Sequence, residues 1–356
     1  MGVDAEYGPL VSGWPDRRFA DLLGSRLPIL AAPMAGAAGV ALAVAAIEGG
    51  AVGSLPCALL TAEEGRAQVV AVRAGCTGPL NLNFFCHVMP EGADDSAWRA
   101  LLAPFYELQS IAAAAGSGPL RRPFDAAMCA MVEEVRPELV SFHFGLPAED
   151  LLERVRRSGA RIVGNATTIA EARWLAERGV DAVIAQGWEA GGHAGHFLGA
   201  PPEEQMGLFA LLPQVVDAID VPVIAAGGIA DARGIVAALA LGAAAVQLGT
   251  AYLHCPESLV GSEHRAGLAG EAAERTGFTN LYTGGLARGL PTPLTEALGR
   301  IRPEAPPYPL ASAALAPLGL KPMWAGQAAR LGSPEPARAL TERLGREALA
   351  LLGQKA

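Results

Sequence analysis

The sequence is organised by short apolar segments that alternate with helical stretches. The segments are continuously apolar, which is typical of parallel strands covered on both faces. Eight repeats favour a closed (β/α)8 TIM barrel over an open doubly wound sheet, and no Gly-x-Gly-x-x-Gly fingerprint follows the first strand. The predicted strands cover residues 27–34, 51–54, 80–84, 139–143, 161–165, 181–186, 221–226 and 244–248.

The alternation stops after Thr250. Residues 254–317 contain helical fragments and a proline-rich run at 303–309. We therefore predict a barrel formed by residues 1–253 and 318–356. A smaller, mainly helical insertion, residues 254–317, is expected to lie over the mouth of the barrel. The end of the chain, 323–352, is expected to return as helix packed on the barrel.

Composition excludes several classes. Net charge is -9, charged residues make up only 18%, and no block of like charge occurs, so nothing suggests a nucleic-acid surface. The apolar stretch 27–46 approaches the length of a membrane span but is broken by proline and glycine, which argues against a membrane protein. Residues 1–10 do not resemble a signal peptide. The five scattered cysteines fit reduced thiols and a cytoplasmic protein.

The sixth predicted strand leads into a loop rich in glycine and histidine. This loop, 186–196, reads Gln-Gly-Trp-Glu-Ala-Gly-Gly-His-Ala-Gly-His. Glycines allow the backbone to approach a ligand closely, and a histidine can move protons near neutral pH. Because active sites of such barrels lie at the carboxyl ends of the strands, we interpret His193 as a general base.

The last two strands both end in turns suited to a phosphate group. Gly227-Gly228 follows the seventh strand and Gly249-Thr250 the eighth. In these barrels a phosphate commonly binds after these two strands. Simple tight turns would also explain the glycines.

Amide side chains at the strand ends fit the edge of a flat heteroaromatic ring. Asn83, Gln186 and Gln247 occupy such positions, and an amide both donates and accepts hydrogen bonds. Met34 could press on a ring face. Taken singly, each amide is equally well explained as a buried structural residue. Together with the phosphate turns they favour a phosphorylated planar cofactor, FMN before NAD.

Three further histidines are candidate substrate contacts. His143 ends the fourth strand, His87 follows the third, and His196 lies three residues beyond His193. A structural role explains each of them equally well. A metal site formed by Glu189, His193 and His196 is conceivable, but no regular element sets their spacing, and we predict no metal.

The sequence resembles the nitronate monooxygenase family, formerly called 2-nitropropane dioxygenases, in its first class. The motifs occur in order through nearly the whole chain. They are Ala-Ala-Pro-Met at 31–34, Asn-Leu-Asn-Phe-Phe-Cys-His at 81–87, Val-Ser-Phe-His-Phe-Gly-Leu-Pro at 140–147, Gln-Gly-Trp-Glu-Ala-Gly-Gly-His at 186–193, Val-Pro-Val-Ile-Ala-Ala-Gly-Gly-Ile-Ala at 221–230, Gln-Leu-Gly-Thr at 247–250 and Trp-Ala-Gly-Gln at 324–327.

The resemblance implies a flavin enzyme that oxidises alkyl nitronates with O2 to a carbonyl compound and nitrite. His193 would deprotonate neutral nitroalkanes, a step that a nitronate does not need. Substrate contacts would come from His87, His143, His196 and Gln327. The predicted FMN site consists of Ala32, Pro33, Met34, Asn83, Gln186, Gly191, Gly192, Gly227, Gly228, Gln247, Leu248, Gly249 and Thr250.

The sequence also departs from the family pattern near the expected mouth. The family usually has arginine after the histidine, where this chain has Ala194 and then His196. In the segment 282–291 only Ala287-Arg288-Gly289 follows the usual pattern. These changes leave the expected FMN contacts intact and affect the residues expected to select the substrate. An FMN-dependent NAD(P)H reductase, acting on an enoyl thioester or a quinone, and a non-catalytic flavin-binding barrel remain alternatives, and a homodimer is one open assembly state.

Overall fold

The structure is a computed structural model, and it describes residues 13–92, 94–111, 120–199 and 202–353. A parallel eight-stranded sheet runs in the order β1-β9-β8-β6-β5-β4-β3-β2. Its strands are β1 (Ile29–Ala31), β2 (Gly53–Pro56), β3 (Leu80–Phe85), β4 (Leu139–His143), β5 (Arg161–Ala166), β6 (Ala182–Gln186), β8 (Val223–Ala226) and β9 (Ala245–Leu248).

The two edge strands of this sheet meet and close the ring. Leu30 of β1 forms a parallel bridge with Val52, directly before β2. The amide of Ala31 donates to the carbonyl of Val52 at 2.9 Å, and the amide of Val52 donates to the carbonyl of Ile29 at 2.9 Å. The predicted (β/α)8 barrel is therefore confirmed. The predicted strand 27–34 is shortened to 29–31, because Pro28 and Pro33 on either side cannot donate to the ladder. The predicted strand 51–54 is shifted to 53–56.

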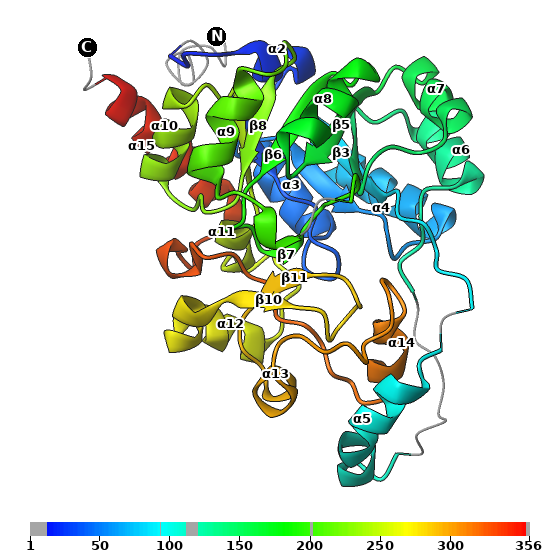
Figure 1. The fold of residues 1–356 in the computed structure, drawn as a ribbon. Helices are drawn as coiled ribbons and strands as arrows, with labels where there is room; N and C mark the ends of the chain where they lie inside the picture. Colours follow the sequence, from blue (N-terminus) through cyan, green and yellow to red (C-terminus); the bar gives the residue numbers. More distant parts are fainter. Residues whose placement is uncertain (1–12, 93, 112–119, 200–201, 354–356) are drawn as a thin grey trace.

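A helix lies between each pair of successive strands, and the last helix follows β9 (Figure 1). Threonine caps begin two of them, Thr61 before α4 and Thr168 before α8, each paired with a glutamate in a capping box. The set comprises α3 (Val40–Glu48), α4 (Ala62–Gly75), α6 (Ala126–Val135), α7 (Glu149–Arg157), α8 (Ile169–Glu177), α9 (Leu208–Val216), α10 (Ala232–Ala240) and α15 (Ala337–Gly353).

The amino-terminal end of the barrel is filled by apolar side chains. Phe19 and Leu23 of α2 (Arg18–Leu23) cluster with inward-facing residues of the strands, among them Leu139, Val163 and Ile224. Alternate residues such as Val140 face the surrounding helices. This alternation makes the barrel interior a packed core, so a ligand site is left only at the carboxyl ends.

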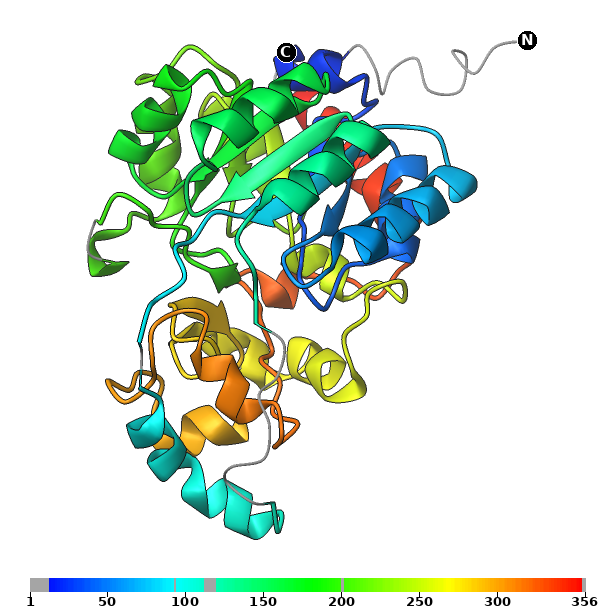
Figure 2. The ribbon, with the colours of Figure 1, turned by 90° about the vertical axis from the view of Figure 1, so that its right-hand side faces the viewer.

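A second unit covers those carboxyl ends (Figures 1 and 2). It contains a cluster of buried apolar residues from α14 (Ala311–Leu315), α13 (Pro293–Leu298) and the turn near Leu281. Helix α5 (Ser96–Leu108), which follows β3, packs into the same cluster through Trp98, whose indole N–H donates to the carbonyl of Ala311 at 3.2 Å. The predicted barrel segment 1–253 includes α5, since nothing local in the sequence of α5 indicates this long-range contact.

The remaining elements join the two units. A three-stranded antiparallel sheet has the order β10 (Gly277–Thr279), β11 (Ala287–Gly289), β7 (Gly192–His193). Thus the loop after β6 pairs with the second unit through Ala287 and His193. The other helices are α11 (Thr250–Leu253) and α12 (Ser262–Ala269), with 3-10 turns at Pro202–Glu204, Glu271–Arg275 and Ala329–Leu331.

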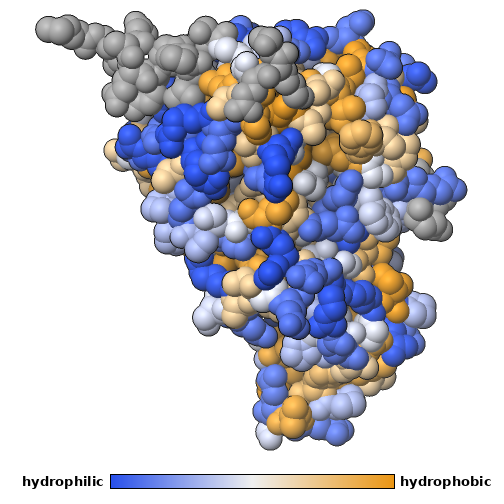
Figure 3. Space-filling model, turned by 90° about the vertical axis from the view of Figure 1, so that its left-hand side faces the viewer, coloured by the Kyte–Doolittle hydropathy of each residue, from blue (hydrophilic) through white to orange (hydrophobic). Residues whose placement is uncertain are grey.

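On the face that carries α10, α15 and α12, hydrophilic and apolar residues are interspersed, and the molecule narrows toward its lower end (Figure 3).

The membrane-length stretch 27–46 is divided between β1 and α3. Within the described part of the chain, no helix combines the length and apolar character that crossing a membrane requires. The five cysteines are unpaired there.

Candidate active site

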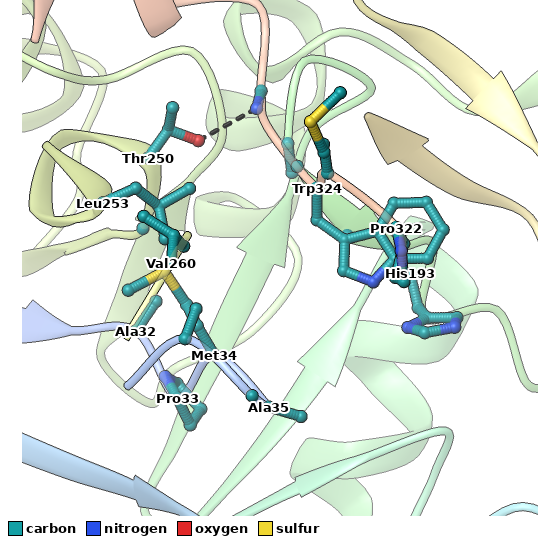
Figure 4. A pocket seen from close by; sticks show the side chains of 18 of the residues that line it. Ala32, Pro33, Met34, Ala35, His193, Thr250, Leu253, Val260, Pro322 and Trp324 are labelled. Atoms are coloured by element: carbon teal, nitrogen blue, oxygen red, sulfur yellow. Dashed lines mark hydrogen bonds between the residues drawn. The ribbon is translucent and has the colours of Figure 1, made fainter. Parts of the chain in front are cut away.

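A cavity of about 820 Å³ lies at the carboxyl ends of the barrel strands, a size typical of cofactor sites. Strand-end residues including Met34 and Thr250 form one side, and Pro322 and Trp324 lie opposite with His193 (Figure 4). Of the predicted site residues, those lining it are Ala32, Pro33, Met34, Asn83, His143, Gln186, Gly191, Gly192, His193, Gly227, Gly228, Gln247, Gly249 and Thr250.

Four predicted site residues do not line this cavity. The side chain of Leu248 is fully buried, and its carbonyl accepts from the amide of Ala32 at 2.8 Å. Gln327 is exposed, and its amide donates to the carbonyl of Glu189 at 2.9 Å. His87 and His196 are also absent from the lining of the cavity. The structure therefore does not place these four residues where they would contact a ligand in the cavity, and their roles in binding stay predictions.

Gln186 organises the glycine–histidine loop. Its Nε2 donates to the carbonyl of His193 at 2.8 Å, and its Oε1 accepts from the amide of Gly195 at 3.0 Å. The Nδ2 of Asn165 donates to the same oxygen at 3.0 Å. Since both ends of the Gln186 amide are bonded inside the protein, this residue holds the loop in shape.

His193 is fixed in place by the second unit. Its ring Nε2 lies 2.9 Å from the hydroxyl of Thr283, and its ring centroid lies 5.6 Å from that of Trp324. Burial, followed by the charge of Arg121, lowers the pKa of His193 well below the usual value for histidine. The imidazole is therefore neutral at physiological pH, which is the state that a proton acceptor needs.

His143 and His87 are neutral as well. Burial lowers the pKa of each to about 4. Neither histidine supplies a positive charge to the cavity near pH 7, although sequence analysis considered both as groups that could hold the nitronate oxygens. Any role that they have in binding must rest on hydrogen bonding.

These lowered pKa values predict an acid-sensitive fold. The unfolded chain takes up protons on His87 and His143 below about pH 6.5, whereas the folded protein does so only near pH 4. The free energy of unfolding should therefore fall as the pH is lowered from about 6.5 toward about 4. Thermal unfolding across this range measures the effect. His143→Asn should show a shallower decrease, and an unchanged slope in that variant would contradict the assignment for His143.

The turns after β8 and β9 form a backbone cradle. Gly227 and Gly228 have φ values of +110° and +69°, which favour glycine. The Thr250 hydroxyl accepts from the amide of Gly326 at 2.9 Å (Figure 4). The amino terminus of α10 has fewer free N–H donors to offer a phosphate. The Asp231 carboxylate already accepts from the first-turn amides of Arg233 and Gly234. The glycine turns are thus the part suited to a phosphate.

The cavity also presents an acceptor without a partner. In the described residues, the buried Oε1 of Gln247 has no hydrogen-bond donor. A buried acceptor of this kind costs stability unless a ligand satisfies it, and a flavin ring edge carries a matching N–H. With the glycine cradle beside it, the set of residues fits FMN.

A substitution at Gly191 tests whether this backbone cradle binds FMN. A Cβ built on Gly191 would lie 2.5 Å from the amide nitrogen of Gly326, part of the backbone held by Thr250. Gly191→Ala should therefore displace that backbone and weaken FMN binding about ten- to hundredfold. Fluorescence titration of the apoprotein measures the change. Gly353→Ala, where a Cβ meets nothing within 4 Å, is the matched control. Equal FMN affinity in both variants would contradict the prediction.

His196 belongs to a buried anchor behind the loop. Its Nδ1 lies 2.7 Å from the Thr167 hydroxyl, which in turn donates to the carboxylate of Glu171 at 2.7 Å. The same carboxylate accepts from the amides of Phe197 at 2.7 Å and Leu198 at 3.3 Å. His196 thus ties the end of the glycine–histidine loop to α8.

The hypothetical metal ligands have separate partners. The Glu189 carboxylate accepts from the amide of Leu208, His193 contacts Thr283, and His196 contacts Thr167. Among the residues that the structure describes, no three His, Cys, Asp or Glu side chains are grouped so as to hold a metal ion.

Several residues around His193 lie outside the predicted site. Arg121 lines the cavity, Tyr308 has its ring centroid 5.1 Å from that of His193, and Thr283 contacts the His193 ring. These residues come from outside the βα repeat, so no strand-end pattern indicates them. Trp324 lies in one of the motifs that carried the resemblance, which was the available signal for it.

Arg288 explains why one short piece of the divergent segment is retained. Its side chain is 3% exposed, and its Nε donates to the carbonyl of Trp188 at 3.1 Å. Its guanidinium lies 4.4 Å from the Phe278 ring centroid. Arg288 therefore fastens the loop after β6 to the second unit. Ala194, beside it, is buried, and its amide donates to the carbonyl of Leu286 at 2.9 Å.

A family model described as nitronate monooxygenase matches residues 17–344. The chain belongs to this family. A nitronate monooxygenase of Paraburkholderia phytofirmans is 40% identical over 347 residues, 93% of this chain and 94% of that protein. One from Pseudomonas aeruginosa is 40% identical over 92% of this chain and 97% of its own length.

Solved structures agree with this assignment. A nitroalkane oxidase from Streptomyces ansochromogenes superposes with a TM-score of 0.86 at 34% identity, covering 95% of this chain and 99% of its own. FabK from Thermotoga maritima has a TM-score of 0.73 at 25% identity, with coverages of 95% and 97%. Membership of the nitronate monooxygenase family makes the chain a flavin-dependent oxidoreductase, and the barrel fold is shared with these neighbours.

Proposed function

We propose that this protein oxidises alkyl nitronates with O2 in the cavity at the carboxyl ends of the strands, with His193 as the base for neutral nitroalkanes. The products are a carbonyl compound and nitrite. The observation that carries the assignment of roles is a neutral, buried His193 on the lining of a cavity that also presents the cradle and the unpaired Gln247 acceptor.

When bound, FMN would supply the redox chemistry that links oxidation of the nitronate to reduction of O2. On the protein side, the turns at Gly227-Gly228 and Gly249-Thr250 would hold the phosphate. Gln247 would accept a hydrogen bond from the ring edge, and Met34 would contact the ring. The Met34 sulfur lies 3.7 Å from the position that a Cβ on Gly249 would take, so Met34 and Gly249 are close neighbours in the wall of the site. Gln186 positions the loop that carries His193.

His193 moves the proton. With a neutral nitroalkane, His193 would take the proton from the carbon that bears the nitro group. With a nitronate this proton is already absent, so binding and orientation are the remaining tasks of the protein. The surrounding rings of Phe85, Tyr308 and Trp324 keep bulk water away from the imidazole and leave it neutral.

Anaerobic mixing tests the function. The purified enzyme should be yellow, and its flavin spectrum should change when a nitronate is added without O2. Admission of O2 should then yield nitrite. Rapid bleaching by NADH, with no response to any nitronate, would instead identify an NAD(P)H-dependent reductase. A colourless protein that FMN does not reconstitute would contradict a flavin enzyme.

We expect the enzyme in the cytoplasm, with O2 and a small nitronate or nitroalkane as its substrates. The unpaired cysteines support a reducing compartment. A homodimer is one assembly consistent with the fold. Cell fractionation and light scattering of the purified protein decide these two points.

A further inference from the structure

Arg121 places a buried positive charge on the lining of the cavity. Its side chain is 8% exposed. Hydrogen bonds on either side hold the backbone there, from the amide of Arg122 to the carbonyl of Ala58 at 3.1 Å and from the amide of Phe124 to the carbonyl of Phe85 at 2.7 Å. The neighbouring Arg122, by contrast, is exposed.

This charge lacks a counterion. Among the described residues, no carboxylate forms an ion pair with Arg121, and its buried Nε has no hydrogen-bond acceptor. The preceding stretch 112–119 consists of Ala, Gly, Ser and Pro and contains no acidic residue. A buried guanidinium without a partner is costly for a fold, so its presence on the cavity lining points to an anionic ligand.

Other buried polar groups lie nearby. The Tyr308 hydroxyl is buried and has no hydrogen-bond partner in the described residues, and the buried ring nitrogens of His87 are near only the Arg121 backbone. The His87 and Tyr308 ring centroids are 4.8 Å apart, and those of Tyr308 and His193 are 5.1 Å apart. The charge of Arg121 acts on all three side chains. Arg121 therefore lies on the same cavity lining as His193, with the polar groups of Tyr308 and His87 packed close to that histidine.

We propose that Arg121 is the anion-binding residue of this cavity and holds the two oxygens of the substrate's nitro or nitronate group beside His193. The guanidinium presents paired N–H donors that match two oxygens on one atom. The neutral histidines cannot provide this charge. The inference rests on the proposed function and adds the group that recognises the nitronate.

Arg121 would also assist the proton transfer. When His193 removes the proton, the C–H bond breaks, and its electron pair forms the C=N bond of the nitronate. The negative charge then resides on the nitronate oxygens, while the proton resides on His193. A guanidinium at those oxygens stabilises the charge as it develops. The new anion also offsets the charge of Arg121, which otherwise opposes protonation of His193.

Substitution of Arg121 tests the site by kinetics. Arg121→Gln should raise KM for ethyl nitronate about ten- to hundredfold and lower kcat/KM for nitroethane by a similar factor. Arg121→Lys should restore part of the loss, because it keeps the charge without the paired donors. Arg122→Gln removes the same charge from an exposed neighbour and should behave like the wild type. Thermal unfolding confirms that each variant is folded.

Three kinetic outcomes would overturn the proposal, two of them in Arg121→Gln. One is an unchanged KM for ethyl nitronate in folded Arg121→Gln. The other is a loss confined to propionate-3-nitronate, which carries a carboxylate as well, because Arg121 would then bind the tail of the substrate. An equal loss in Arg122→Gln would also contradict it, since a general effect of net charge would explain the result.

Nitrate binding provides a readout that does not depend on turnover. Nitrate is a planar oxyanion that resembles the nitro group. The pKa of His193 is followed by NMR of labelled histidine rings, in which the His193 signal is the one that disappears in His193→Asn. Nitrate should raise this pKa in the wild type relative to equal chloride and leave it unchanged in Arg121→Gln. The same nitrate response in both proteins overturns the anion site. If nitrate acts through Arg121 but no nitronate is oxidised, the anion site stands and the proposed function fails.

Discussion

His193→Asn should keep its FMN and lose about 10²- to 10⁴-fold in kcat/KM with neutral nitroalkanes, the usual contribution of a general base. With nitronates, the loss should be far smaller, because no proton has to be removed. The reason is local: His193 is neutral, buried and on the cavity lining, while Gln186 holds the loop through the His193 backbone carbonyl, which the substitution leaves in place.

The measurement compares nitroethane and ethyl nitronate in the same preparation, with FMN content read from absorbance. His196→Asn serves as the control because His196 carries the same ring and lies in the same loop but contacts Thr167 away from the cavity. Equal losses of His193→Asn on both substrates would reject the role of a base. A loss of activity in His196→Asn with nitroethane but not with ethyl nitronate would indicate that His196, and not His193, is the base.

Glu171→Ala should destabilise the fold by about 3–5 kcal/mol, since several hydrogen bonds to one charged group are lost at once. The carboxylate is fully buried and accepts from the amides of Thr167 and Phe197, both at 2.7 Å. Without it, these donors remain buried and unsatisfied. The segment after the glycine–histidine loop should loosen, so FMN affinity should fall as well.

Thermal or urea-induced unfolding measures this loss. Glu177→Ala is the matched control, because Glu177 is an exposed glutamate in the same helix, α8, and should change the free energy of unfolding by less than about 0.5 kcal/mol. A destabilisation of Glu171→Ala no larger than that of Glu177→Ala would show that water replaces the carboxylate at no cost.

Much of the barrel follows from local pattern. Thr61 and Asp231 are of the residue types preferred at helix starts, and their side chains cap α4 and α10. Polar residues at strand ends, such as Gln247 and Thr250, come together because the carboxyl ends of parallel strands share one edge. This regularity is why most of the predicted cofactor residues line one cavity.

The second unit was less predictable. Its core joins Trp98 of α5 to Ala311, more than two hundred positions later. No short-range periodicity encodes such a pair. The pairing of Gly192-His193 with Ala287-Arg288 is similarly non-local.

The sequence by itself determined the eightfold barrel, the family, the flavin and the loop that carries His193, because each depends on residues close together in the chain or on repeated strand ends. Only the tertiary structure decided which polar groups face the ligand and which are used internally. It assigned His196 to the Glu171 anchor and brought Arg121 to the cavity. The physical reason is that burial and partnership, which set charge and pKa, depend on contacts between distant segments.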